Sequence, residues 1–210
     1  DYGDELQIEV YELENGTVVI DAGVKAQGGI GAGIYLSRLC MSDLADIQLA
    51  PCDIGGILLP GVQVATDYPA VSCMDSQCAM WQIKADKYFA MGSGPARVLS
   101  GKTRDLYEKI GFEEFSDIGV IVLESNKLPD EKVSASIAQK CGIDPADLRI
   151  AIAPTDSVAG LVQVSARVVE TGLHKLFTMG FDINTIKSGW GRAPISPITG
   201  DATNCMGSSN

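Results

Sequence analysis

The chain has 210 residues, of which 46% are hydrophobic and 20% are charged, an ordinary composition for a globular protein with one large core or two small ones. Its formal net charge is −11 and it carries no basic patch, which argues against nucleic acid as a partner. The sequence shows no signal peptide and no apolar run long enough to cross a bilayer, so we expect a cytoplasmic protein that does not enter the membrane.

The cysteine and histidine content limits the catalytic and metal chemistry that the chain can support. None of the cysteines has CxxC spacing and several lie among apolar residues, so we interpret them as buried, reduced thiols. They are Cys40, Cys52, Cys73, Cys78, Cys141 and Cys205. Because His174 is the single histidine, we expect no conventional zinc site, and a Ser-His-Asp or Cys-His mechanism would have to use that residue.

The first hundred residues predict an irregular segment that begins with a hairpin. Residues 6–23 alternate apolar and polar side chains on both sides of Asn15-Gly16, which indicates a hairpin with a type I′ turn. A glycine-rich stretch then leads into a helix expected at residues 34–44. The other elements expected in this part are strands at residues 47–50 and 62–66, a helix at residues 70–81 and a helix that begins at Pro95.

The second half predicts a regular order of strand, helix, strand and helix, typical of an α/β layer. In chain order these are a strand at residues 117–124, a helix at 129–141, a strand at 148–153 and a long helix at 157–177, before a Gly/Pro-rich tail at 187–197. We therefore expect a mixed α/β (α+β) fold with two α/β domains. We place them at residues 1–105 and 106–210, with the junction between residues 100 and 115.

The segment SARVVETG places Arg167 and Glu170 three residues apart within the last expected helix, which is otherwise apolar. Helical i,i+3 spacing brings the two charged groups to the same face, where each can orient the other. A buried ion pair is costly unless each charge has a partner or a ligand. A fixed, partly desolvated carboxylate can activate water beside a cationic substrate. We take this pair as the candidate catalytic centre, with a solvated helix pair as the alternative.

The segment MGSGPAR at residues 91–97 is a second candidate site. Its backbone amides, Ser93, Gly94 and Arg97 stand at an expected helix start, which suits a phosphate or a carboxylate. It is not a Walker A loop, because no Lys-Ser/Thr pair follows, and Pro95 interrupts the dinucleotide-binding pattern. Turn structure alone explains the glycines equally well, so both interpretations stay open.

Other polar and aromatic side chains suggest further contacts to a ligand. Asp67, Ser76 and Gln77 gather small polar groups near a turn, either as a ligand-binding loop or, for Asp67, as a helix-capping turn. Trp190 could stack on a flat ring or cover the core beneath a loop. Arg192 is a further candidate for binding an anion. Together these groups predict a cleft for a polar, partly aromatic small molecule.

Five uncommon segments carry a resemblance that covers nearly the whole chain. In chain order they are VQVATDYPAVSCMDSQCAMWQI, DKYFAMGSGPARVLSG, LESNKLPDEKV, SARVVETG and GRAPISPI. In these segments the chain resembles the methenyltetrahydromethanopterin cyclohydrolases. Members of that family extend beyond this C-terminus and begin somewhat earlier, so we expect a fragment.

The resemblance implies a cytoplasmic enzyme of archaeal one-carbon metabolism, in methanogenesis or methane oxidation. Such an enzyme reversibly hydrolyses N5,N10-methenyltetrahydromethanopterin to the N5-formyl compound without a metal or a redox cofactor. The resemblance also implies two α/β domains with the pterin in the cleft between them. As an assembly it implies a homo-oligomer, and homotrimers are found for the fold.

The resemblance also assigns roles to individual residues. It places Arg167 and Glu170 on the Arg-x-x-Glu of the family's active-site helix, and the turn at Ser93–Arg97 near the pterin or the phosphate on its tail. Tyr68 and Cys78 depart from the family pattern, since many members have His and Lys at these positions. A non-catalytic pterin- or phosphate-binding module is therefore the alternative, and a nucleotide-binding protein that uses the same turn is a third hypothesis.

Overall fold

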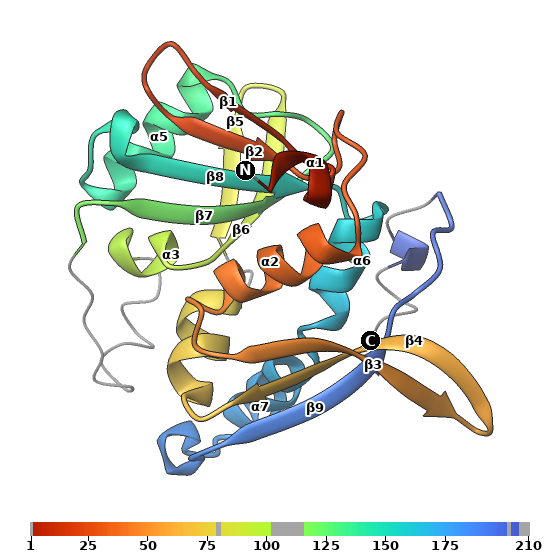
Figure 1. Cartoon of the computed structure of the whole chain (residues 1–210). Helices are drawn as coiled ribbons and strands as arrows, with labels where there is room; N and C mark the ends of the chain where they lie inside the picture. The colour runs from red at the N-terminus through yellow and green to blue at the C-terminus, as the bar shows by residue number, and fades with distance from the viewer. Residues whose placement is uncertain (1, 79–80, 102–115, 201–202, 206–210) are drawn as a thin grey trace.

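The computed structural model describes residues 2–78, 81–101, 116–200 and 203–205, and its largest element is a six-stranded mixed sheet, sheet A (Figure 1). Its strand order is β1-β2-β8-β7-β6-β5. The strands are β1 (Glu9–Glu12), β2 (Val18–Asp21), β5 (Trp81–Ala85), β6 (Tyr88–Ser93), β7 (Gly119–Glu124) and β8 (Leu148–Ala153). The three inner strands β2, β8 and β7 are parallel, and β1, β6 and β5 extend them with antiparallel pairs.

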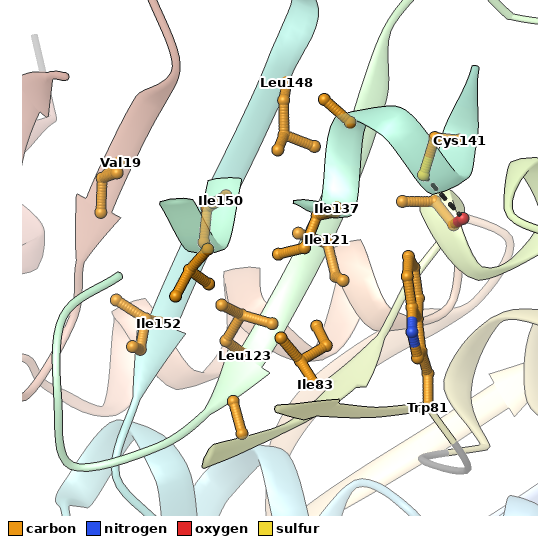
Figure 2. Packing of buried hydrophobic residues seen from close by; sticks show 14 residues of the cluster. Val19, Trp81, Ile83, Ile121, Leu123, Ile137, Cys141, Leu148, Ile150 and Ile152 are labelled. Carbon is orange, nitrogen blue, oxygen red and sulfur yellow. Dashed lines mark hydrogen bonds between the residues drawn. The ribbon is translucent and has the colours of Figure 1, made fainter. Parts of the chain in front are cut away.

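The central strands β7 and β8 are rich in branched aliphatic residues, as is typical of parallel strands that are covered on both faces. One face is covered by α5 (Glu131–Cys141), which begins at Asp130, where the carboxylate accepts a hydrogen bond from the Val133 amide. Between α5 and the sheet lies a cluster in which Trp81 and Ile137 pack against aliphatic side chains of the strands (Figure 2). This cluster forms a dry core on the α5 side of sheet A.

The opposite face of sheet A is covered by α2 (Ile30–Cys40) and α6 (Val158–Ser165), which lie side by side between the two sheets (Figure 1). They approach closely because Gly33 has no side chain. A Cβ atom at Gly33 would lie 2.5 Å from the Val162 Cβ and 2.8 Å from the Ala159 carbonyl oxygen. Mostly small residues, among them Ala32 and Ala151, fill the space between the helices and the sheet.

A second, antiparallel sheet, sheet B, lies beyond these helices in the order β3-β4-β9. Its strands are β3 (Asp46–Ile54), β4 (Ile57–Thr66) and β9 (Gly189–Pro194). It packs against α7 (Val168–Thr178) and against η1 (Ala70–Gln77), a π-helix, through a second apolar cluster that includes Val64 and Val169. The remaining elements are α1 (Gly3–Leu6), α3 (Ala96–Leu99), η2 (Pro145–Asp147) and η3 (Ile183–Thr185).

The mixed α/β fold class is confirmed, and most expected elements exist with shifted ends. The hairpin around Asn15-Gly16 forms, but the predicted type I′ turn is wrong. The Gly16 amide donates to the Leu13 carbonyl at 2.9 Å, and Gly16 has a φ of 83° whereas Asn15 is not among the described residues with positive φ. A single left-handed glycine after an ordinary turn is the three-residue hairpin with a bulge.

Three other expectations are corrected by the structure. The helix expected at residues 70–81 is the π-helix η1 and ends at Gln77, while Trp81 begins a hairpin of β5 and β6 that the sequence did not predict. The tail at residues 187–197 contains β9. The long helix at residues 157–177 is two helices, α6 and α7.

The division into two domains near residue 105 stays a prediction. Both sheets combine strands from the two sides of that position, because β2 pairs with β8 and β4 pairs with β9. Most of the expected junction, residues 102–115, lies outside the described residues. Among the described residues, no helix is both long and apolar enough to cross a membrane.

Candidate active site

The break between α6 and α7 positions the candidate catalytic pair. α6 ends at Ser165, and the next two residues, Ala166 and Arg167, leave helical geometry with ψ angles of −2° and 4°. Arg167 is therefore the N-cap residue of α7, and Glu170 lies in the first turn of that helix. A carboxylate in the first turn is favoured by the positive end of the helix dipole.

Three segments of the chain hold the Arg167 guanidinium. Its Nη1 donates to the Gln77 carbonyl at 2.7 Å, and its Nη2 donates to Ser93 Oγ at 2.8 Å. With its carboxamide oriented so that the oxygen faces the guanidinium, which has only donors, Gln163 accepts from Nη2 at 2.7 Å and from Nε at 3.2 Å. Glu170 Oε2 lies 3.8 Å from Nη1, and the side chains of Arg167 and Glu170 are only 12% and 11% exposed. The two charges thus lie close together and nearly buried, not solvated on a helix surface.

Two neutral thiols lie near Glu170. Burial, reinforced by the Glu170 charge, raises the pKa of Cys78 to about 11. Burial likewise raises the pKa of Cys73 to about 12, and Glu170 adds to the shift. All six cysteines of the chain are buried thiols, as the sequence predicted. Around this pair, therefore, Arg167 and Glu170 carry the charge and the thiols do not.

A slightly exposed carboxylate beside a fixed guanidinium can hold a water molecule and accept its proton. The guanidinium keeps such a carboxylate ionised, because an opposite charge nearby favours the charged form. The described residues contain no group of three or more His, Cys, Asp or Glu side chains that could hold a metal ion. The paired guanidinium and carboxylate fit acid–base chemistry.

Comparison with known proteins identifies the family. The family described as Cyclohydrolase (MCH) matches the chain from residue 1 to residue 210. The chain belongs to this cyclohydrolase family. A methenyltetrahydromethanopterin cyclohydrolase of Methanosarcina mazei is 56% identical over 210 residues, which are 100% of this chain and 65% of that protein.

Other relatives of the same name agree. The protein of Methanosarcina barkeri is 55% identical over 100% of this chain and 65% of its own length. The protein of Methanocaldococcus jannaschii is 43% identical over 99% of this chain and 65% of its own length. The chain thus spans about 65% of the length of these curated relatives.

In this chain, the groups of the glycine-rich turn make contacts inside the protein. The Gly94 amide donates to the Ser76 carbonyl at 2.8 Å, with a φ of 101° that favours glycine. Arg97 is 1% exposed, and its Nη1 donates to the Asp75 carbonyl at 3.0 Å. Ser93 binds Arg167 instead of facing solvent. That these residues bind substrate stays a prediction.

Asp75 is a buried acid that the sequence analysis did not single out. Its side chain is fully buried, and neither carboxylate oxygen has a hydrogen-bond partner among the described residues. Burial raises its pKa to about 7, although Arg97 opposes the shift. Eight residues gather at the C-terminal end of η1, three of them from η1 itself, and we call them the polar centre. They are Asp75, Ser76, Gln77, Ser93, Arg97, Gln163, Arg167 and Glu170.

Two of the expected ligand contacts lie in a different place. Asp67 and Trp190 line an open pocket of about 810 Å³, whose lining does not include Arg167 or Glu170. Asp67 Oδ1 accepts a hydrogen bond from Ser188 Oγ at 3.0 Å. The exposed Trp190 ring lies 5.7 Å from the Arg192 guanidinium carbon, and Arg192 Nη1 donates to the Pro51 carbonyl at 2.9 Å. The structure therefore separates the expected contacts into the polar centre and this pocket, and it places Arg192 beside Trp190 but outside the pocket lining.

Gln163 is the other residue that the sequence analysis missed. It is 4% exposed on α6 and lies one helical turn before Arg167. A signal was present, because Gln163 is the one amide side chain in the apolar run VAGLVQVS and stands four residues before the arginine.

Proposed function

We propose that the full-length protein reversibly hydrolyses N5,N10-methenyltetrahydromethanopterin to N5-formyltetrahydromethanopterin in archaeal one-carbon metabolism. The observation that carries the proposal is the nearly buried Arg167–Glu170 pair at the α6–α7 junction, in a chain that matches the cyclohydrolase family throughout its length. Relatives named methenyltetrahydromethanopterin cyclohydrolase, up to 56% identical, support the choice of substrate.

The chemistry of the substrate suits a fixed carboxylate. The methenyl group is an amidinium-like cation, and hydrolysis begins with the addition of water to its central carbon. Glu170 would hold this water and accept its proton, while its negative charge favours the bound cation. When the tetrahedral adduct collapses, N10 leaves and must be protonated, and the proton now on Glu170 is the nearest source.

Arg167 would keep Glu170 ionised and correctly oriented. Its guanidinium is suited to this role because acceptors on η1, β6 and α6 fix the plane of the group. The remaining substrate contacts are proposals of the same kind. Trp190 and Asp67 would bind a part of the substrate away from the methenyl carbon, because the lining of their pocket does not include Glu170, and Arg192 would add a positive charge beside Trp190.

The test is turnover of purified full-length protein, followed as loss of the near-ultraviolet absorbance of the methenyl chromophore. We expect Glu170→Gln to lower kcat by at least about 100-fold, the usual contribution of a positioned general base. Glu131→Gln is the matched control, since Glu131 also lies in the first turn of an eleven-residue helix but is exposed. A loss in Glu170→Gln within about tenfold, or 1.4 kcal/mol, would contradict the proposed role of Glu170.

The same preparation distinguishes the alternative function. Calorimetric titration with tetrahydromethanopterin that shows tight binding, combined with no turnover by the wild-type protein, would favour a non-catalytic binding module. The position of Cys78 close to Glu170 motivates this alternative, because a neutral thiol there supplies no positive charge to the site.

We further propose that the protein needs no resident metal or redox cofactor and works in the cytoplasm as a homo-oligomer, with a trimer as the expected form. The polar centre combines two guanidinium groups and two carboxylates with amides and hydroxyls, and its Arg167–Glu170 pair supports acid–base catalysis. Unchanged turnover after dialysis against a chelator tests the first point, and light scattering of the full-length protein tests the second.

A further inference from the structure

Gln163 occupies the edge of the Arg167 guanidinium that points away from Glu170. Its carboxamide meets Nη2 at 2.7 Å and Nε at 3.2 Å, while Nη1 is the atom nearest to Glu170. A guanidinium carries only donors, so the carboxamide atom that meets it is the oxygen. Gln163 thus accepts two hydrogen bonds from one edge and leaves the other edge to Glu170.

The break between α6 and α7 makes this contact possible. Gln163 is in the last turn and a half of α6, and Arg167 stands just beyond the end of that helix at the N-cap of α7. The Arg167 side chain can therefore contact α6 and the first turn of α7 at the same time. The Gln77 carbonyl and Ser93 Oγ complete the set of acceptors, and none of these three acceptors carries a charge.

The neutrality of these acceptors has an electrostatic consequence. Among the described residues, Glu170 is the one carboxylate within 4 Å of the Arg167 guanidinium. Because Gln163 fixes the guanidinium plane without adding a negative charge, the full positive charge of Arg167 acts on Glu170. A carboxylate in the place of Gln163 would form an equally good fork with Nε and Nη2 but would compete for that charge.

We propose that Gln163 is a positioning residue for the cyclohydrolase reaction: it fixes the Arg167 guanidinium with an uncharged acceptor and so keeps Glu170 ionised as the base. This inference rests on the proposed function. Gln163 is buried on α6 and acts through Arg167, so we expect it to affect kcat and the pH dependence of turnover more than KM.

The other titratable groups near the Arg167–Glu170 pair do not keep Glu170 ionised in the way proposed for Gln163. Cys73 and Cys78 face Glu170 from η1 and its end, and both are held neutral by burial. Cys40 on α2, close to Arg167, is also neutral because burial raises its pKa. Glu124 on β7 acts on Cys40 and lines a small cavity together with Ser93 and Gln163, and its Oε1 accepts a hydrogen bond from Thr155. Of the remaining groups, Asp75 and Arg97 in the polar centre and His174, one turn after Glu170 on α7, are unchanged in all the variants below.

The decisive variant is Gln163→Glu in the full-length protein, with Gln139→Glu as its charge-matched control on the exposed face of α5. The new carboxylate is a like charge for Glu170 and raises its pKa, so the acidic limb of the pH profile of kcat/KM should move upward by about one pH unit. The Gln139→Glu profile should coincide with that of wild type.

A second variant and a second measurement separate this inference from the proposed function. Gln163→Met removes the acceptor while keeping the chain length, and we expect kcat to fall by about tenfold with KM changed less than about twofold. The pKa of the Glu170 carboxyl, measured by carbon-13 NMR with Glu170→Gln for assignment, should rise in Gln163→Glu whether or not the protein turns over substrate. An unchanged Glu170 pKa in that variant, or wild-type kinetics in Gln163→Met, overturns the role of Gln163. Absence of wild-type turnover together with a raised Glu170 pKa overturns the proposed reaction and leaves the electrostatic role of Gln163 supported.

Discussion

Two regions of this molecule are equally dry but are held together by different forces. In the centre of sheet A, Ile121, Leu148 and Ile150 are completely buried among other aliphatic side chains (Figure 2). In the polar centre, Asp75 and Gln77 are just as inaccessible, yet they carry charges or hydrogen-bonding groups. The first region gains free energy from apolar area alone, whereas the second depends on directional contacts such as those to Arg167, and it leaves the Asp75 carboxylate without a hydrogen-bond partner among the described residues.

The difference predicts where substitutions will act. Aliphatic packing is non-directional, so a loss in the sheet A core should lower the free energy of unfolding and leave the chemistry of the folded molecules intact. Contacts in the polar centre are directional, so a small change there should alter turnover or pH dependence before it unfolds the chain. The following variants test this separation, from the largest expected effect to the smallest.

The largest effect is expected for Ile150→Ala in the middle of β8. Ile150 is fully buried between two parallel neighbours, and its truncation leaves a cavity that should lower the free energy of unfolding by about 3–4 kcal/mol. Chemical denaturation measures this loss, and Val10→Ala on β1, where the side chain is 58% exposed, is the control. We expect kcat per folded molecule to be unchanged. A loss below about 1 kcal/mol would mean that this core relaxes around the cavity.

Next comes Arg167→Lys, which keeps the positive charge but removes the planar fork. An ammonium cannot satisfy the Gln77, Ser93 and Gln163 acceptors in the same geometry, so we expect kcat to fall by about 30-fold, equivalent to about 2 kcal/mol. Arg149→Lys is the control, because Arg149 donates to the Ala146 carbonyl at an exposed position. Wild-type turnover in Arg167→Lys would indicate that charge alone, without orientation, supports Glu170.

Asp75→Asn should change how stability depends on pH. The pKa of Asp75 is raised by burial from an ordinary 3.8 to about 7, so the folded state binds its proton more tightly than the unfolded state does. The wild-type protein therefore loses stability as the pH rises from about 4 to about 7, and Asp75→Asn should lack this loss, gaining about 1–3 kcal/mol relative to wild type over that window.

Thermal or chemical unfolding at several pH values measures the gain. The control is Asp86→Asn, since the Asp86 side chain is 84% exposed and its φ of 48° is one that asparagine tolerates. Parallel pH curves for Asp75→Asn and wild type would show that a partner outside the described residues stabilises the charged form of Asp75.

The contrast between the two regions also explains what the sequence could predict. β7 and β8 lie within one or two residues of their expected positions, because a short apolar run such as LRIAIA predicts a buried strand from local sequence alone. The break at Ala166-Arg167 contains no proline or glycine that would predict it, so the sequence from α6 to α7 predicts a single helix. β9 was taken for a loop because its glycines weaken the strand pattern.

The candidate site shows the same limit. The proximity of Arg167 and Glu170 could be predicted from the sequence because the two residues are only three positions apart, and the structure places the two side chains close together. The other partners of Arg167 could not be predicted in this way, since Gln77 and Ser93 are 90 and 74 residues away from it in the sequence. Contacts of this kind depend on how η1 and β6 pack against the α6–α7 junction, which is a tertiary property.

The smallest effect is expected at an exposed counterpart of the Arg167–Glu170 pair. Arg38 Nε lies 2.7 Å from Asp43 Oδ1, a shorter distance than the 3.8 Å between Arg167 and Glu170, but the two side chains are 42% and 64% exposed. Water screens this pair and both side chains lose entropy to form it, so Asp43→Asn should change the free energy of unfolding by less than about 0.5 kcal/mol. Asparagine is the suitable substitution because Asp43 has a φ of 56°. Denaturation in low and high salt measures the effect. A loss above about 1 kcal/mol would show that distance, not burial, sets the strength of ion pairs in this protein.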